Sequence, residues 1–320
     1  VSPKSNQSTM SVVPPSLLRE QWPQVYDLSA RKEVYINTAS RSALPLCSLQ
    51  AGHAALAEKS EPWTLKDWAA PVCRSRFAEL LGDSGKADNV AIGPSTNYHV
   101  STVANIAEQR LARLLEAGDD DDEKKKKKMK KMKTTKMNVV CLQNQSASAV
   151  YPLQALCARR PDRLEPLRVC QRDPDDDWTS SLLEKIDEGT LLVSTPNYHW
   201  ADGAKVDLHA VAAACRAAGA LLLVDCTQSI GVSPLRNCAP GGQEAAENVL
   251  SSSAGAGAGA GAVTGEEREE EAPVGADFVV ASVHKWLLSP YGMSLMLVGD
   301  KQVEAGYQPW EWHERNVAAA

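Results

Sequence analysis

Short apolar runs alternate along most of the chain with longer segments whose apolar residues recur every three to four positions. An apolar run of about four to eight residues bounded by turn residues is typical of a buried strand, and the longer period is typical of an amphipathic helix. The pattern predicts strands over residues 34–37, 89–92, 138–142, 167–170, 191–194, 221–224, 278–281 and 294–298. It predicts helices over residues 50–60, 71–81, 96–115, 149–159, 179–187 and 207–218.

Buried strands that alternate with helices indicate an α/β fold, in which helices cover both faces of a mostly parallel sheet. Ligands of such sheets bind beyond the carboxyl ends of the strands. The residues that directly follow each predicted strand are therefore the first candidates for a functional site.

Two segments depart from the alternation. Residues 119–136 form an acidic block followed by a basic one, and residues 236–275 contain a glycine–alanine repeat and an acidic run. Neither composition buries enough apolar surface to fold, so both segments are predicted to be solvated insertions. The predicted organisation is an N-terminal segment, 1–30, and one large domain, 31–320, that carries both insertions.

Composition narrows the classes of function. The formal net charge of −6 gives no general case for binding nucleic acid or membranes, and no apolar run is long enough to span a bilayer. Aspartates precede the lysine-rich run 124–133 and offset it, so a nucleic-acid partner is a minor alternative, which steeply salt-dependent binding would favour. The N-terminus has no apolar signal core, and a cytoplasmic location is the default expectation.

The chain has 8 cysteines and no Cys-x-x-Cys pair, which argues against a disulfide framework and a zinc site, so no metal ligands are expected. Cys141, Cys170, Cys215 and Cys226 fall within or beside predicted elements. They are expected to be reduced and to pack as small apolar groups.

Lys285 follows the apolar strand 276–281, and Asp225 follows the apolar strand 221–224. A lysine and an aspartate at strand ends are what a pyridoxal phosphate (PLP) site needs. The lysine amine forms a Schiff base with the cofactor aldehyde, and the aspartate keeps the pyridinium nitrogen protonated. The ordinary alternatives are a surface lysine and an aspartate that caps a helix.

Neighbouring residues add polar groups of the required kinds. Ser282 and His284 flank Lys285, and Gln228 lies in the same turn as Asp225. Residues 93–99 open a long helix after a strand, which predicts either an anion site at the helix N-terminus or a plain cap. Residues 197–203 follow another strand and form either a simple turn or a pocket wall that supplies His199 and an aromatic ring.

These segments, in this order, resemble the class V family of PLP-dependent aminotransferases, which includes cysteine desulfurases, kynureninase and isopenicillin-N epimerase-like proteins. The D-x-x-Q motif at Asp225 and the S-x-H-K motif at Ser282 are specific in this context. The epimerase-like members are the most similar, because their H-W-x-D-G segment corresponds to HWADG here. The stretches that carry the resemblance are residues 34–45, 95–106, 145–156, 199–235, 276–298 and 306–316.

The resemblance implies the large domain of PLP fold type I, a homodimer and an amino-acid substrate. It implies that Lys285 is the Schiff-base lysine, that Asp225 is the pyridinium partner and that Gln228 is the donor to the phenolic oxygen. His199 joins Lys285 and Asp225 as a candidate catalytic residue. The residues expected to hold the phosphate are Thr96, Asn97, Ser282 and His284.

Two departures bear on the reaction. Desulfurases of the family stack a histidine on the cofactor ring, and the matching position here is Ser146. Family members also continue into a C-terminal small domain with the arginine for the substrate carboxylate, and this domain is expected to be missing. The leading interpretation is an enzyme that transaminates, desulfurates or eliminates, or epimerises an amino acid. The alternative is a catalytically incomplete PLP-fold protein with a binding or scaffold role.

Overall fold

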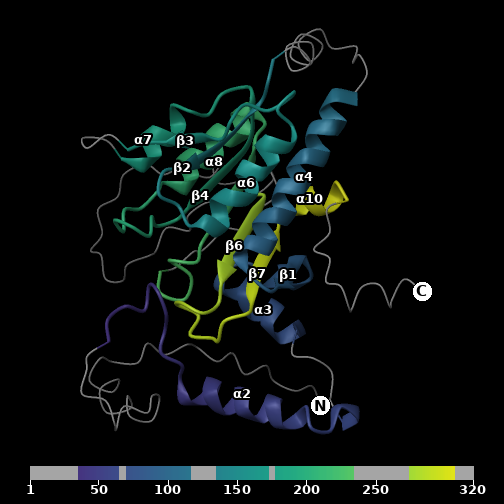
Figure 1. Ribbon diagram of the computed structural model, residues 1–320, viewed down its shortest axis with the longest axis vertical. Helices are drawn as coiled ribbons and strands as arrows, with labels where there is room; N and C mark the ends of the chain where they lie inside the picture. The colour runs from purple at the N-terminus through teal and green to yellow at the C-terminus, as the bar shows by residue number, and fades with distance from the viewer. Residues whose placement is uncertain (1–34, 65–69, 117–134, 173–176, 234–273, 307–320) are drawn as a thin grey trace, which may run out of the picture.

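A computed structural model of the chain describes residues 35–64, 70–116, 135–172, 177–233 and 274–306. Within these ranges one sheet of 7 strands has the order β1-β7-β6-β5-β4-β2-β3 (Figure 1). The strands are β1 (Val90–Gly93), β2 (Asn138–Leu142), β3 (Arg168–Cys170), β4 (Thr190–Pro196), β5 (Leu221–Asp225), β6 (Phe278–Ser282) and β7 (Ser294–Val298). The helices are α2 (Leu46–Glu58), α3 (Ala70–Leu80), α4 (Thr96–Glu116), α6 (Ala147–Arg159), α7 (Trp178–Leu183), α8 (Leu208–Ala218) and α10 (Asp300–Glu304), with 3-10 turns η1 (Pro62–Thr64) and η2 (Ser84–Asn89).

The predicted α/β fold with a mostly parallel sheet is confirmed. Strands β6, β5, β4, β2 and β3 pair in parallel, whereas β7 is antiparallel to both β6 and β1. Residues 283–293 connect β6 to β7 without a helix. A parallel neighbour needs a longer crossover connection, so the reversal at β7 follows from this short link.

Most predicted elements are confirmed. The predicted strands 138–142 and 294–298 coincide with β2 and β7. Two helices differ from their predicted ranges by four residues at one end. α2 begins at Leu46, directly after Pro45, whose fixed φ suits a helix start. α7 ends at Leu183 rather than 187, and Asp187 lies in the turn before β4, where its carboxylate accepts a hydrogen bond from the Gly189 N–H at 2.8 Å.

The strand predicted over 34–37 is wrong for residues 35–37, and Val34 lies outside the described residues. Tyr35 and Ile36 are exposed, and this segment pairs with none of the described strands of the sheet. The Tyr35 hydroxyl instead donates to the carbonyls of Asn37 and Arg41 at 2.9 and 2.6 Å. The segment is a turn, which side-chain hydrogen bonds hold in place of a strand ladder.

Each face of the sheet carries its own apolar core. α4 and α6 pack on one face, and α3, α7 and α8 pack on the other. Alternate residues of β2 divide between them, with Val139 on the first face and Val140 on the second. Helices on both faces explain why the strands are apolar throughout rather than alternating.

The cysteines predicted to pack as apolar groups are buried free thiols: Cys141, Cys170, Cys215 and Cys226. Burial raises the pKa of Cys141 and of Cys215 to about 12, so both remain thiols near neutral pH. Their role is therefore packing.

Several predictions concern parts of the chain that the structure does not describe. The N-terminal segment 1–30 lies outside the described residues, and so do 119–134 and 236–273 of the two predicted insertions. Among the helices of the described ranges, none combines the length and apolar character needed to cross a membrane.

Candidate functional site

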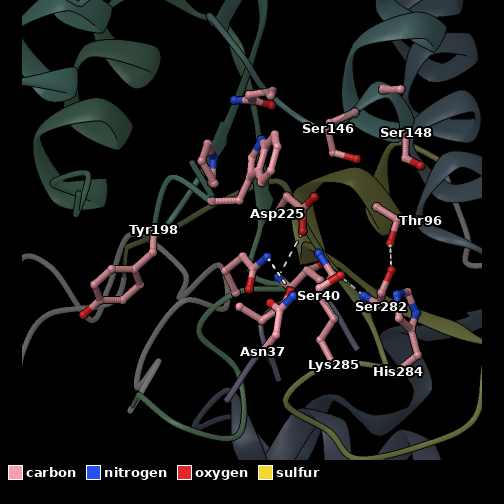
Figure 2. Close-up of a pocket in the computed structure, with 18 residues that line it drawn as sticks. Asn37, Ser40, Thr96, Ser146, Ser148, Tyr198, Asp225, Ser282, His284 and Lys285 are labelled. Atoms are coloured by element: carbon pink, nitrogen blue, oxygen red, sulfur yellow. Dashed lines mark hydrogen bonds between the residues drawn. The ribbon is translucent and has the colours of Figure 1, made fainter. Parts of the chain in front are cut away.

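A cavity of about 680 Å³ lies at the edge of the sheet where β4, β5 and β6 end (Figure 2). This is the edge at which the sequence placed its candidate residues. The start of α4 and the segment after β2 complete the wall. The lining residues are Asn37, Ala39, Ser40, Thr96, Gln145, Ser146, Ala147, Ser148, Ala149, Pro196, Tyr198, Trp200, Asp225, Thr227, Gln228, Ser282, His284 and Lys285.

The predicted pair of Lys285 and Asp225 meets in this cavity. Asp225 ends β5, and Lys285 follows the end of β6 (Figure 2). Burial lowers the pKa of the Lys285 amine, and the charge of Asp225 opposes this effect. Burial also raises the pKa of the Asp225 carboxyl, although the carboxylate accepts a hydrogen bond from the Thr227 N–H at 3.0 Å. A lysine with a lowered pKa has more free amine, which is the form that attacks a carbonyl.

Hydroxyl groups gather beside this pair at the N-terminus of α4. The Oγ1 of Thr96 lies 2.6 Å from the Oγ of Ser282, and the Ser282 N–H donates to the Oγ1 of Thr227 at 3.0 Å. The N–H groups at the start of a helix create a positive potential there, and α4, with 21 residues, is long enough to have such an N-terminus. Helix start and hydroxyls together can hold an anionic group.

Gln228 and His284 also line the cavity, as the sequence indicated. The Nε2 of Gln228 donates to the carbonyl of Ala39 at 3.1 Å, and its Oε1 accepts from the indole of Trp286 at 2.9 Å. The ring of His284 stacks on Tyr291 with centroids 4.0 Å apart. Burial and the charge of Lys285 lower the pKa of this histidine, which favours its neutral form.

Two predicted site residues lie elsewhere. Asn97 is exposed in the first turn of α4 and is not among the lining residues. His199 is buried behind the cavity wall, where its ring packs on Trp178 with centroids 4.5 Å apart. Its ring nitrogens lie 2.9 Å from the carbonyl oxygen of Gln143 and 3.2 Å from the carboxylate of Asp202. His199 therefore anchors the turn whose aromatic residues reach the cavity.

The aromatic wall that the sequence left open consists of Tyr198 and Trp200. The indole N–H of Trp200 donates to the carbonyl of Asn144, which fixes the ring against the segment after β2. These two aromatic residues flank His199 in the sequence. The side chains of the turn thus divide between the cavity and the protein interior.

Sequence reasoning missed the lining residues Asn37, Ala39 and Ser40, to which it gave no role. Asn37 ends the segment that was predicted to be a strand, and Ala39 and Ser40 follow it in a turn. Only long-range contacts bring these residues to the cavity. The backbone N–H of Ser42 donates to the carbonyl of His284 at 3.2 Å. Ser146 had been noted only as the position that matches the stacked histidine of desulfurases. Gln145 and residues 147–149 were missed, although they follow β2 and the strand-end rule applied to the other strands would have found them.

Gly231 supports the turn that carries Gln228. Its φ of +90° is unfavourable for other residues, and a Cβ there would lie 2.7 Å from the carbonyl oxygen of Trp286. Gly231→Ala is therefore expected to lower the free energy of unfolding by about 1–3 kcal/mol, measured by urea denaturation. Gly292→Ala is the matched control, because Gly292 has a φ of +100° and open space around its Cβ position. Equal losses in the two variants would show that the close approach to Trp286 contributes nothing.

The chemistry of the cavity follows from these groups. It offers an amine for a carbonyl, a carboxylate for a basic ring nitrogen and hydroxyl donors for an anion, all at one edge of the sheet. The family model of the class-V aminotransferases matches residues 126–237. The resemblance to this family is confirmed. The matched class-V segment contains Asp225 and Gln228 and ends before Lys285.

Solved structures of similar fold include cysteine desulfurases. One from Thermococcus onnurineus NA1 shares 14% identity at a TM-score of 0.56, and one from Escherichia coli shares 16% at a TM-score of 0.60. Each similarity covers 92% of this chain and 60% of the other chain. A mutant of C-DES with glycine covalently linked to its PLP cofactor shares 17% identity at a TM-score of 0.56, over 89% of this chain and 60% of that one. No curated protein matches the chain by sequence.

These comparisons establish the fold alone, because sequence identities this low do not transfer a function from one protein to another. The chain spans 60% of the length of these solved structures. The class-V match and the α/β fold are consistent with the large domain that the sequence predicted.

Proposed function

We propose that this chain binds PLP in the cavity and belongs to an enzyme that acts on an amino acid. The observation that carries the proposal is the juxtaposition of Lys285 and Asp225 beside the hydroxyls of Thr96 and Ser282. The class-V match and the PLP-linked structural relative support it. An amino-acid substrate and a homodimer belong to the same proposal, because both come from the family resemblance.

The residues present fit the cofactor. Thr96 and Ser282, with the N-terminus of α4, would hold the phosphate, and Asp225 would lie against the pyridine nitrogen. Lys285 would attach the aldehyde carbon covalently through its Nζ. When bound, PLP supplies an electron sink for the bonds around the α-carbon of an amino acid.

The protein's own groups prepare this chemistry. Lys285 is the one primary amine among the described lining residues, so we assign to its Nζ both the attachment of the cofactor and proton movement at the substrate. Burial keeps more of this amine neutral than in an exposed lysine. Asp225, when ionised, would favour a proton on the ring nitrogen through its negative charge. His199 acts as a positioning residue, because it anchors the turn that carries Tyr198 and Trp200.

The test is to mix the purified protein with PLP, reduce it with borohydride and locate the adduct by peptide mass spectrometry. We expect an absorption band that borohydride removes, and one adduct per chain on the peptide that contains Lys285. Pyridoxal without the phosphate is the control, and it should label that peptide far less, because the hydroxyls at α4 would have no anion to hold. Labelling confined to other lysines, or equal labelling by pyridoxal, would overturn the proposal.

A further inference from the structure

Trp286 immediately follows Lys285 in the sequence but lies outside the set of described residues that line the cavity. Its indole Nε1 donates a hydrogen bond to the Oε1 of Gln228 at 2.9 Å. Gln228 does line the cavity, and so does Ala39, whose carbonyl accepts from the Nε2 of Gln228 at 3.1 Å. The amide of Gln228 is thus held between one partner behind the wall and one partner in it.

The two partners allow only one orientation of this amide. An indole N–H is a donor without acceptor capacity, and a backbone carbonyl is an acceptor without donor capacity. The Oε1 of Gln228 must therefore face Trp286, and the Nε2 must face Ala39. In a flipped amide, the Nε2 hydrogens of Gln228 would face the indole N–H of Trp286, and its Oε1 would face the carbonyl oxygen of Ala39. Neither pair can form a hydrogen bond.

The backbone supports this arrangement from the other side. Gly231 allows the carbonyl of Trp286 to approach the turn so closely that a Cβ would lie 2.7 Å from that oxygen. The turn between Asp225 and Gly231 and the loop after Lys285 are therefore packed against each other at backbone level. This packing holds the indole in reach of Gln228.

We propose that Trp286 is a positioning residue, which fixes the amide of Gln228 so that its free Nε2 hydrogen is offered to an acceptor in the cavity. The inference rests on the proposed function, and the acceptor would be the phenolic oxygen of PLP, for which the family resemblance makes Gln228 the donor. An N–H donor at this place stabilises the anionic form of the oxygen and cannot accept a hydrogen bond from the hydroxyl of the neutral form. Trp286 thereby acts on the cofactor through Gln228 without touching it.

The first measurement uses cofactor-free protein and follows the indole N–H signal of Trp286 by ¹⁵N nuclear magnetic resonance. The signal is assigned by its absence from Trp286→Phe. We expect it to exchange slowly with water in the wild type and about fivefold faster in Gln228→Ala, since a hydrogen bond of about 1 kcal/mol net corresponds to a factor of about five. Unchanged exchange in Gln228→Ala would refute the bond itself, whatever the cofactor does.

The second measurement follows the absorption band of bound PLP as a function of pH. Trp286→Phe, which keeps an aromatic ring without the N–H, should raise the pH of the spectral transition by roughly half to one unit. It should also weaken PLP binding about threefold to tenfold. Trp63→Phe is the control, because Trp63 is exposed in η1 and is not a lining residue.

A double-mutant cycle decides whether the effect passes through Gln228. In the Gln228→Ala background, Trp286→Phe should leave both the spectral transition and the affinity unchanged. Equal effects of Trp286→Phe in both backgrounds would mean that the ring acts by packing alone, and the inference would be wrong. The absence of any PLP band in the wild-type protein would instead overturn the proposed function. The exchange rate of the indole N–H would still test the contact between Trp286 and Gln228.

Discussion

Replacement of Lys285 by alanine is expected to abolish the borohydride-stable incorporation of PLP at this position and the absorption band that reports it. The reason is chemical: Lys285 is the primary amine among the described lining residues, so no other lining group there forms a covalent bond with an aldehyde. The loss should be complete rather than graded. The variant is checked by mass spectrometry of the reduced protein and by its visible spectrum.

Two variants separate this effect from a change in charge or folding. Lys285→Arg keeps a cation beside Asp225 but has no neutral amine near physiological pH, so it should fail to incorporate PLP as well. Lys185→Ala removes an exposed lysine in the turn after α7 and should leave incorporation unchanged. The free energy of unfolding of Lys285→Ala should stay within about 1 kcal/mol of the wild type, because the buried amine already carries a desolvation penalty. An adduct that persists in both Lys285 variants would disprove the assignment.

The second large effect is a loss of stability in mild acid that depends on His99. This histidine is buried in the first turn of α4, and its Nε2 lies 3.3 Å from the carbonyl oxygen of Ser294. Burial lowers the pKa of His99 to about 4, from an ordinary value of 6.5. The unfolded chain therefore binds a proton at a higher pH than the folded chain does.

The sign and size of the effect follow from this difference. The contribution of neutral His99 to stability is complete above about pH 6.5 and is lost as the pH falls toward 4. The shift corresponds to roughly 3 kcal/mol of unfolding free energy over that range. Urea denaturation at pH 7 and at pH 4.5 measures the loss.

The matched variant is His99→Gln, which keeps an amide donor for the Ser294 carbonyl and does not titrate. It should lose markedly less stability between the two pH values than the wild type, even if it is less stable at pH 7. His209→Gln, at an exposed position on α8, should retain the wild-type pH dependence. Parallel pH curves for the wild type and His99→Gln would contradict the prediction. Because Thr96 stands in the same helical turn as His99, protonation should also loosen the hydroxyl group that faces the cavity.

Much of the candidate site could be predicted from local sequence. Asp225 and Lys285 each follow a run of apolar residues, and parallel strands that are buried on both faces bring their carboxyl ends to one edge. The positions of Ser282 and Gln228 then follow from short spacing along the chain. His199 was placed in the site by the same rule and Asn97 by the family resemblance, but neither says which way a side chain points.

The sequence by itself determined the elements and the α/β class, because the apolar period of a segment is a local property. It also predicted the edge of the sheet at which the cavity lies, since strand ends are set by the same pattern. The bounds of β2 and β7 were predicted to the residue, because every residue of these two strands is buried and their apolar runs are therefore continuous.

Only the tertiary structure decided the contacts between distant segments. It turned residues 35–37 away from the sheet, brought Asn37, Ala39 and Ser40 to the cavity and placed Trp286 behind Gln228. It also buried His199 against Trp178. Each of these outcomes depends on hydrogen bonds or packing between residues far apart in the chain, and no periodic pattern records such contacts. These contacts complete the lining of the cavity, whereas its location follows from the sequence.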